Sequence, residues 1–401
     1  MIHILDKSKC CGCWACVQRC PKQCITMQED NEGFLYPEVD KKDCIDCGLC
    51  EKVCPMINIG KASLPEKVFA AKCKDEKTRL SSSSGGMFFT LAKAVIQENG
   101  VVFGATYDES WGVRISYAEQ IDGVLPMMGS KYLQSTVGTA YQDAERFLKQ
   151  GRKVLFSGTP CQIAGLHTYL RKEYDNLLSV DFLCHGVPSP GVWKRYLSET
   201  CDLLSENLRH SHITGIEFRN KEACGWKRYS FVIRADSDSI GRNDSVLLSD
   251  IHYENPYMKG FLRNLYLRPS CYECRCKEGV NHSDLTIADF WGVHDILPSF
   301  DDDKGVSLVL VYTSKGYELF NQLALYTQET SLNEAINRNG GYYSHAQWNP
   351  KRPAFFKAFN KGNETISHMV TRLLHRPLWR RIAGKGKSMI LELYSAYFKC
   401  K

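Results

Sequence analysis

The sequence CCGCWACVQRCP, residues 10–21, decides how this chain is organised. Its cysteine spacing returns in CIDCGLCEKVCP, residues 44–55, with every repeated cysteine and the proline displaced by 34 positions. The segment 1–60 holds ten of the 19 cysteines of the chain. The first seven residues carry no apolar signal core, so we expect a cytoplasmic protein whose thiols stay reduced. Clustered thiols in a reducing compartment usually bind metal.

Each repeat has the spacing CxxCxxCxxxCP, which binds 4Fe-4S clusters in two-cluster ferredoxins. In that pattern three thiolates of one repeat hold one cluster, and the fourth cysteine ligates the other cluster. The predicted ligand sets are therefore crossed: Cys10, Cys13, Cys16 and Cys54 for one cluster, and Cys44, Cys47, Cys50 and Cys20 for the second. Structural zinc sites are the alternative, although zinc usually takes its thiolates from two separated CxxC pairs. Cys11 and Cys24 fall outside the pattern, and we interpret them as packing residues.

The rest of the chain has the pattern of strands that alternate with helices. Strands are expected at 68–71, 101–107, 153–156, 178–183, 231–233, 285–288 and 307–311. Helices are expected at 87–97, 138–149 and 161–171. We therefore predict an α+β (mixed α/β) protein. It would consist of a ferredoxin-like domain at 1–60, an α/β body in two parts at 66–150 and 151–320, and a helical basic extension at 321–401.

Charge is distributed unevenly along the chain. The net charge is +6, but residues 351–401 alone carry 12 Lys and Arg against 2 Asp and Glu. The extension could be a packed helical segment with a solvated basic face, an amphipathic helix on an anionic membrane, or a docking element for an acidic partner. No apolar run approaches the ~20 residues of a membrane span, and no motif indicates nucleic-acid binding.

A second group of cysteines lies in the α/β body. Cys271, Cys274 and Cys276 are closely spaced, and Cys161 and Cys184 each follow an expected strand. Together these thiols could ligate a third cluster, since soft thiolate ligands suit iron–sulfur sites. The alternative is that they are separate buried cysteines that only pack.

Two short segments have the composition of phosphate-binding loops. Residues 81–86, SSSSGG, precede an expected helix, and the hydroxyls of Ser83 and Ser84 add hydrogen-bond donors. Residues 157–160, SGTP, form a strand-to-helix turn with proline at the first helical position. Free backbone N–H groups at helix starts attract phosphate, so both segments suit a flavin pyrophosphate or another nucleotide. An ordinary Ser/Thr helix cap is the alternative. Lys131 could pair with a phosphate or a flavin carbonyl, or could be a solvated lysine.

With these segments in view, the chain resembles the coenzyme F420 hydrogenase/dehydrogenase beta-subunit family, in the form with an N-terminal two-cluster ferredoxin domain. The matching stretches, within residues 1–320, are SSGG at 83–86, KYLQS at 131–135, FSGTPCQ at 156–162, DFLCHGVP at 181–188, RPSCYEC at 268–274 and SDLTIADFWG at 283–292. The resemblance implies an iron–sulfur flavoprotein that binds FAD.

The resemblance also implies which residues of the body are functional. Flavin-binding residues would be Ser83, Ser84, Gly85, Gly86, Lys131, Gln134, Ser135, Ser157, Gly158, Thr159 and Pro160. Ligands of a third cluster would be Cys161, Cys184, Cys271 and Cys274, whereas Cys276 departs from the usual pattern. His185 and Asp289 are polar residues beside the motifs, and a structural role suits each of them equally well.

A flavin links one-electron clusters to two-electron organic chemistry. We therefore expect an oxidoreductase in which electrons pass between ferredoxin or a similar carrier, the 4Fe-4S clusters and FAD, and so reduce or oxidise a small organic substrate. The alternative is a non-catalytic electron-transfer subunit of a larger hydrogenase- or dehydrogenase-type complex.

Overall fold

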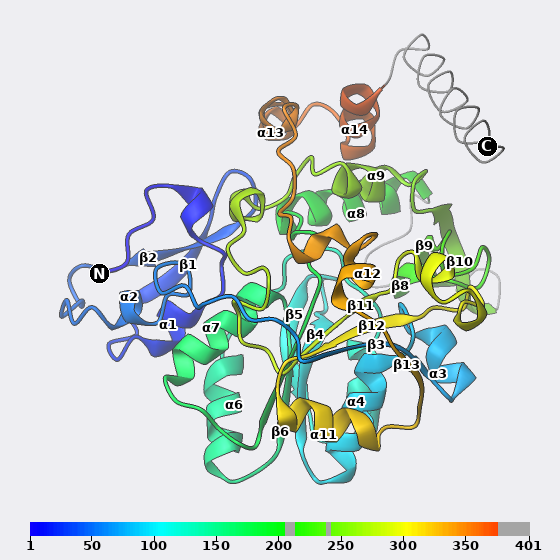
Figure 1. Cartoon of the computed structure of the whole chain (residues 1–401). Coiled ribbons are helices and arrows are strands. Elements are labelled where there is room, and N and C mark those ends of the chain that lie inside the picture. Colours follow the sequence, from blue (N-terminus) through cyan, green and yellow to red (C-terminus); the bar gives the residue numbers. More distant parts are fainter. Residues whose placement is uncertain (205–212, 238–241, 376–401) are drawn as a thin grey trace, which may run out of the picture.

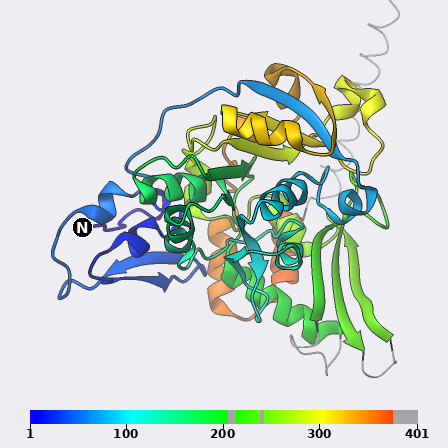
Figure 2. The ribbon, with the colours of Figure 1, turned by 90° about the horizontal axis from the view of Figure 1, so that it is seen from below.

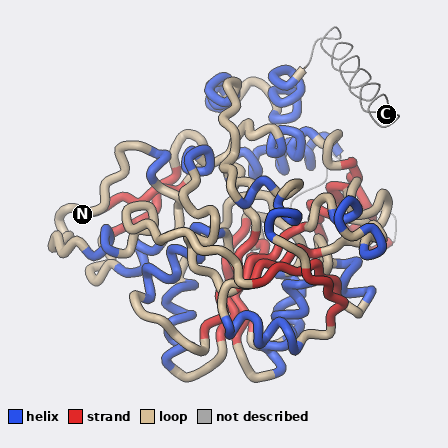
Figure 3. Tube along the Cα trace, viewed as in Figure 1, coloured by secondary structure: helices blue, strands red, loops and turns tan. Residues whose placement is uncertain are grey.

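The computed structural model describes residues 1–204, 213–237 and 242–375. A small N-terminal domain and a three-stranded sheet lie on opposite sides of a large central sheet (Figures 1 and 2). Helices surround the central strands, as the secondary-structure colouring shows (Figure 3). The predicted mixed α/β fold with a ferredoxin-like domain at its N-terminus is thereby confirmed.

The N-terminal domain keeps the internal repeat in its backbone. It contains α1 (Ala15–Arg19), β1 (Ile25–Glu29), β2 (Leu35–Val39) and α2 (Leu49–Lys52), with β1 and β2 paired antiparallel. Trp14 precedes α1 at φ 67°, and Gly48 precedes α2 at φ 68°. These two residues occupy the same position of the two repeats, so the second copy uses glycine where the first holds tryptophan in a left-handed conformation.

The central sheet has eight strands in the order β13-β3-β12-β11-β7-β6-β4-β5. Their bounds are β3 (Lys67–Cys73), β4 (Val101–Tyr107), β5 (Val113–Ala118), β6 (Val154–Ser157), β7 (Leu177–Phe182), β11 (Leu285–Asp289), β12 (Ser307–Val311) and β13 (Leu325–Glu329). Strands β4, β6, β7 and β11 are parallel, and the outer pairs are antiparallel. The short apolar strands β6 and β12 lie in the interior of the sheet, as expected for strands covered on both faces.

Helices cover both faces of this sheet. One face packs against α4 (Met87–Gln97) and α11 (Ser314–Gln322). The other face packs against α6 (Ala140–Lys149) and α7 (Pro160–Leu170), and residues of the N-terminal domain belong to the same core cluster. The shorter helices of this part are α3 (Glu76–Ser81), α5 (Ile121–Val124), α10 (Val293–Ile296) and α12 (Leu332–Ile336).

The second sheet consists of β8 (Ile213–Asn220), β9 (Ser230–Ser237) and β10 (Arg242–Ile251), antiparallel in the order β10-β9-β8. It shares an aromatic core with α8 (Pro190–Leu204) and α9 (Pro256–Leu262), in which Trp193, Phe218 and Tyr257 are fully buried. Only the middle strand was predicted from the sequence. Polar residues interrupt β10, so it lacks the apolar pattern by which β9 was found.

The segment predicted as a helical extension at 321–401 is only partly helical. Leu325–Glu329 forms β13, an edge strand paired antiparallel with β3. Four of its five residues are exposed, so the strand has no apolar alternation to reveal it. Helices α13 (Arg352–Lys361) and α14 (Ile366–Leu374) pack on α8 and α9 and bury Phe355 and Met369 in the body. The basic residues from 376 to 401 lie outside the described part of the chain.

Among the helices that the structure describes, none combines the length and the apolar character needed to cross a bilayer.

Candidate metal centres and cofactor loops

Two hollows in the N-terminal domain are each lined by four of the repeated cysteines. The first, which we call the outer hollow, is lined by Cys20, Cys44, Cys47 and Cys50. The second, the inner hollow, is lined by Cys10, Cys13, Cys16 and Cys54. Each has about 340 Å³ of space free of protein atoms, including the part open to solvent. These are the two crossed sets that the spacing predicts, so the fourth cysteine of each repeat lies with the other repeat.

The two hollows differ in their surroundings. At the outer hollow Cys47 is exposed, and Ile45 beside it is 60% exposed. At the inner hollow Cys13 is buried against α7, and Cys16 is buried in the small core of the N-terminal domain. A Cβ atom placed on Gly165 of α7 would lie only 2.9 Å from the Cβ of Cys13. The inner hollow is therefore held tightly against the body, and the outer hollow is on the solvent side.

Several cysteines of the body lie near one another. Cys161 begins α7, Cys184 follows β7, and Cys271 lies in the 3-10 turn Pro269–Glu273. Burial raises the pKa of Cys184 to about 12, and the neighbouring Cys161 and Cys274 add to the effect. Burial also raises the pKa of Cys271, with Cys184, Cys274 and Cys161 acting in the same direction. The four thiols named by the resemblance are thus neighbours.

Cys11 connects this group to the inner hollow. It shares one core cluster with Cys13, against which Cys161 packs, and it lines the inner hollow itself. Cys276 is buried near Cys161 and Cys274 as a fifth thiol of the body group. Cys24 lies 3.5 Å from Cys20, sulfur to sulfur, within the small core of the N-terminal domain. Within the described residues, no three His, Cys, Asp or Glu side chains meet closely enough to enclose a single metal ion.

The loop 83–86 is held in place by hydrogen bonds and by a close approach to the backbone of a neighbouring strand. The Ser84 hydroxyl donates to the Val306 carbonyl at 2.8 Å, and the Gly85 amide donates to the Ser307 hydroxyl at 3.0 Å. A Cβ atom on Gly85 would lie 2.4 Å from the carbonyl oxygen of Ala71, so only glycine fits there. The loop ends at Gly86, which precedes α4 at φ 90° and leaves the first-turn amides of that helix without intrahelical partners.

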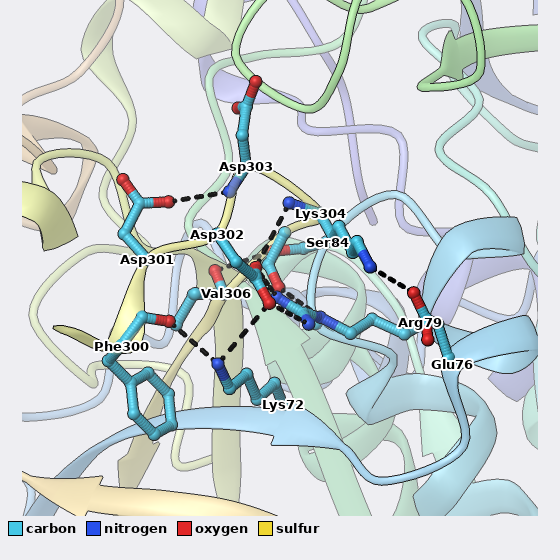
Figure 4. Close-up of polar contacts among 12 residues, drawn as sticks. Lys72, Glu76, Arg79, Ser84, Phe300, Asp301, Asp302, Asp303, Lys304 and Val306 are labelled. Carbon is cyan, nitrogen blue, oxygen red and sulfur yellow. Dashed lines mark hydrogen bonds and ion pairs between the residues drawn. The ribbon is translucent and has the colours of Figure 1, made fainter. Parts of the chain in front are cut away.

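Two buried basic residues, Lys221 and Arg79, lie beside the loop 83–86. Lys221 is buried and donates to the carbonyls of Arg79 at 2.6 Å and Ser84 at 3.0 Å. Burial lowers the pKa of Lys221 to about 7. Arg79 pairs with Asp302, which lies in the acidic loop of residues 301–303 (Figure 4). Although burial acts against it, this pairing lowers the pKa of Asp302 to about 2.

The second loop leads into α7 through a capping box. The Thr159 side chain accepts from the Gln162 amide, and the Gln162 side chain accepts from the Thr159 amide at 3.0 Å. Gln162 also donates to the Ser135 hydroxyl at 2.9 Å. The predicted alternative, a Thr cap, is therefore present here, whether or not the loop also binds a ligand.

The segment 130–135 joins the two loops. At one end the Ser130 amide donates to the Ser83 hydroxyl at 2.7 Å, and at the other end Ser135 accepts from Gln162. Lys131 between them is half-buried and donates to the Met128 carbonyl at 3.0 Å, and burial lowers its pKa to about 7. Gln134 points the other way and donates to the Cys11 carbonyl at 3.0 Å. The two predicted loops and the segment 130–135 therefore converge, but Gln134 contacts the N-terminal domain.

Sequence reasoning missed a buried ion pair beside these loops. Arg219, at the end of β8, donates to Asp289 at 2.6 and 2.9 Å and to the Ser83 carbonyl at 3.2 Å. Trp226 donates to the same carboxylate at 2.8 Å. The Arg219 Nε is buried without a hydrogen-bond partner among the described residues. No motif surrounds Arg219 in the sequence, so nothing there indicated its position. His185 is exposed and lies 2.6 Å from Asn264.

Two family models match this chain. Residues 9–57 match the 4Fe-4S dicluster domain, and residues 151–334 match the C terminus of the coenzyme F420 hydrogenase/dehydrogenase beta subunit. Over residues 151–334 the body of this chain is therefore similar to the C terminus of that beta subunit. The protein is accordingly an iron–sulfur electron-transfer protein related to that beta subunit, and its N-terminal domain is of the 4Fe-4S type.

The individual relatives match either most of the chain or the N-terminal domain alone. An uncharacterized protein of Methanocaldococcus jannaschii is 27% identical over 317 residues, which is 65% of this chain and 85% of the relative. The N-terminal domain is similar to NADH-quinone oxidoreductase subunit I 2 of Geobacter metallireducens, 42% identical over 56 residues, and to the ferredoxin 7Fe of Hydrogenibacillus schlegelii, 48% identical over 42 residues. These matches cover 13% and 10% of this chain, and 43% and 47% of those relatives.

Among solved structures, the F420-reducing [NiFe] hydrogenase complex from Methanosarcina barkeri contains a similar chain. The TM-score is 0.44 at 16% sequence identity, and the match covers 73% of this chain and 97% of that one. A likeness of this size supports no statement about function.

Proposed function

We propose that this protein is an iron–sulfur flavoenzyme in which electrons travel inward from the solvent side of the N-terminal domain. The cysteines of the outer hollow would hold a first 4Fe-4S cluster, and those of the inner hollow would hold a second. The clusters would supply one-electron exchange between a carrier such as ferredoxin and FAD in the body, and FAD would supply the two-electron reduction of a small organic substrate. The observation that carries this proposal is that Cys11 and Cys13 of the N-terminal domain share one core cluster, against which Cys161 of the body packs.

This contact supports transfer between the two parts of the chain. Iron–sulfur clusters exchange single electrons, and the potential of each depends on burial and on hydrogen bonds to its sulfurs. The outer hollow is exposed at Cys47, where a carrier can approach, whereas the inner hollow adjoins the body. The neighbouring Cys161, Cys184, Cys271 and Cys274 are the proposed ligands of a third cluster, which would continue the same route.

The convergent loops are the proposed FAD site. When bound, FAD supplies the exchange between one-electron and two-electron chemistry. The helix starts at Ser83–Gly86 and at Thr159–Pro160 offer backbone N–H groups to a pyrophosphate. Lys221 holds the first loop in place, and Lys131 adds a cation between the loops.

A second function, as an electron-transfer subunit of a larger complex, is favoured by the apolar surface of the N-terminal domain. Leu5 is 85% exposed, Ile45 60% and Ile57 58%. Exposed apolar groups of this kind mark protein–protein contacts when they form a patch. Co-purification of a second subunit, together with no flavin in this chain, would favour this reading.

The proposal is tested by reducing the anaerobically purified protein with reduced bacterial ferredoxin while the flavin absorbance is followed. The wild type should show flavin bleaching. Cys47→Ala should keep its flavin but slow the bleaching at least tenfold, because the outer cluster would be lost, and Cys224→Ala should behave as the wild type. Unchanged bleaching in Cys47→Ala would contradict the proposed route.

Flavin binding has its own variant. Lys221→Met removes the amine that joins three carbonyl groups, and it should lower the flavin content while the iron content stays at about eight per chain. Lys227→Met is the matched control, because Lys227 is exposed and pairs with Asp301 on the same acidic loop. Equal flavin content in both variants would place the flavin elsewhere.

A further inference from the structure

We infer that Arg268 is a positioning residue that raises the reduction potential of the inner cluster, an inference that rests on the proposed function. Arg268 is fully buried between the N-terminal domain and the body. Its Nε donates to the Cys10 carbonyl at 2.8 Å, and its Nη2 lies 3.5 Å from the Cys10 sulfur. Its Nη1 donates to Gln134 at 2.9 Å. The guanidinium is thus fixed against a lining residue of the inner hollow.

The charge of Arg268 has no carboxylate partner among the described residues. Three other arginines are buried, and each forms an ion pair: Arg79 with Asp302, Arg219 with Asp289, and Arg352 with Glu32. Around Arg268 the structure places carbonyl oxygens, an amide and the faces of aromatic rings, with Tyr36 at 4.2 Å. Burying an unpaired charge is costly, so a negative group is expected beside it.

A thiolate-ligated cluster in the inner hollow is that negative group. Such a cluster gains a further negative charge when it is reduced, and a fixed cation beside it favours the reduced form. A hydrogen bond to a ligand sulfur acts in the same direction. Arg268 should therefore raise the reduction potential of the inner cluster.

The backbone at Gly12 makes room for this arrangement. Gly12 has a φ of 70°, and a Cβ atom there would lie 2.9 Å from Nη1 of Arg268. The cations that line the outer hollow differ from Arg268. The exposed Met1 ammonium is paired with Asp46 and Glu51, and Lys22 is exposed to solvent. The difference would make the inner cluster the stronger acceptor and direct electrons toward the body.

The test is an anaerobic redox titration of both clusters, followed by electron paramagnetic resonance. In Arg268→Gln, the ratio of reduced to oxidised inner cluster at a fixed solution potential should fall about tenfold or more, which is ~59 mV for one electron. The outer cluster of the same molecules should not shift and serves as an internal reference. Arg268→Lys should recover part of the change, because it keeps the charge.

Arg352→Gln is the matched control. Arg352 is also buried and joins the body to the N-terminal domain, through Glu32 at 2.8 Å, but it contacts no cysteine. It should lower the thermal stability and leave both potentials unchanged. If Arg268→Gln does not fold, Gln134→Glu places a carboxylate against the guanidinium and should lower the inner potential in the same way.

The outcomes separate this inference from the proposed function. A wild type with clearly fewer than about eight irons per chain would overturn both. Eight irons with an inner potential that moves in neither Arg268→Gln nor Gln134→Glu, or with equal shifts of both clusters, would overturn the role of Arg268 alone.

Discussion

Cys54 and Cys20 are the residues on which the crossed ligand sets depend. Cys54 belongs to the second repeat, yet it lines the inner hollow with Cys10, Cys13 and Cys16. We predict that Cys54→Ala removes the inner cluster and lowers the iron content by about four atoms per chain. The remaining paramagnetic signal should be that of the outer cluster.

Cys24→Ala is the control for this variant. Cys24 is a buried cysteine of the same domain, and it should be replaceable without loss of iron. If Cys54→Ala removed the outer cluster instead, each repeat would hold its own cluster and the crossed assignment would be wrong.

At the residue scale, the residues whose position could be predicted were the cysteines that recur at a regular spacing. The spacing of the cysteines in each repeat predicted which of them lie together, because the cluster that they surround sets the distances along the chain between its ligands. The buried cations Arg219, Lys221 and Arg268 gave no such signal. Each acts through contacts with segments more than 60 residues away, such as Arg219 with Asp289 and Arg268 with Cys10. A charged residue in a sequence is normally read as solvated, so their burial was not predictable.

Helix α7 is the element that joins the two parts of the molecule. Gly165 on this helix touches Cys13, and Thr168 donates to the Val53 carbonyl at 2.8 Å. We predict that Gly165→Val forces the N-terminal domain away from the body and slows electron transfer from the clusters to the flavin by at least tenfold. Ala164 lies on the same helix and is half-exposed, so Ala164→Val should have little effect on this rate. Equal rates in the two variants would show that this contact is not on the route.

The same helix carries a histidine that should make stability depend on pH. Burial lowers the pKa of His167 to about 4, and its Nε2 lies 3.3 Å from the Ser179 hydroxyl. Between pH ~4 and ~6.5 the unfolded chain binds a proton that the folded chain does not, so the free energy of unfolding falls as the pH is lowered. His167→Gln should reduce this loss by about 1 to 3 kcal/mol.

Thermal unfolding midpoints measured across this pH range would check the effect. His294→Gln replaces an exposed histidine and controls for the general effect of removing an imidazole. If the wild type and His167→Gln lost stability in parallel, His167 would not be responsible.

At the scale of helices and strands, the predicted bounds were correct where one apolar periodicity continued without a break. The structure places α4 at Met87–Gln97 and β4 at Val101–Tyr107, as the apolar pattern indicated. It failed where tertiary contacts decide the structure. Strand β13 has one buried residue, Leu325, and owes its conformation to pairing with β3. No property of its own five residues distinguishes it from a helix or loop.

For the whole molecule, the N-terminal domain is tied to the last helices that the structure describes. Arg352 near the C-terminal end pairs with Glu32 in the N-terminal domain, 320 positions away, and donates to the Leu267 carbonyl at 3.1 Å. The sequence led us to separate a helical extension from the body at residue 321, because the segment beyond it has a helical, basic pattern and the family resemblance ends there. The buried faces of α13 and α14 show that the segment to residue 374 belongs to the same core.

The central claim is that clusters in the N-terminal domain serve a flavin in the body. Iron, sulfide, zinc and flavin analysis of the full chain, purified without oxygen, tests it most directly. We predict about eight irons and eight sulfides with one FAD per chain, or about twelve irons if the body thiols hold a third cluster. Zinc without sulfide, or iron without any flavin, would contradict the claim.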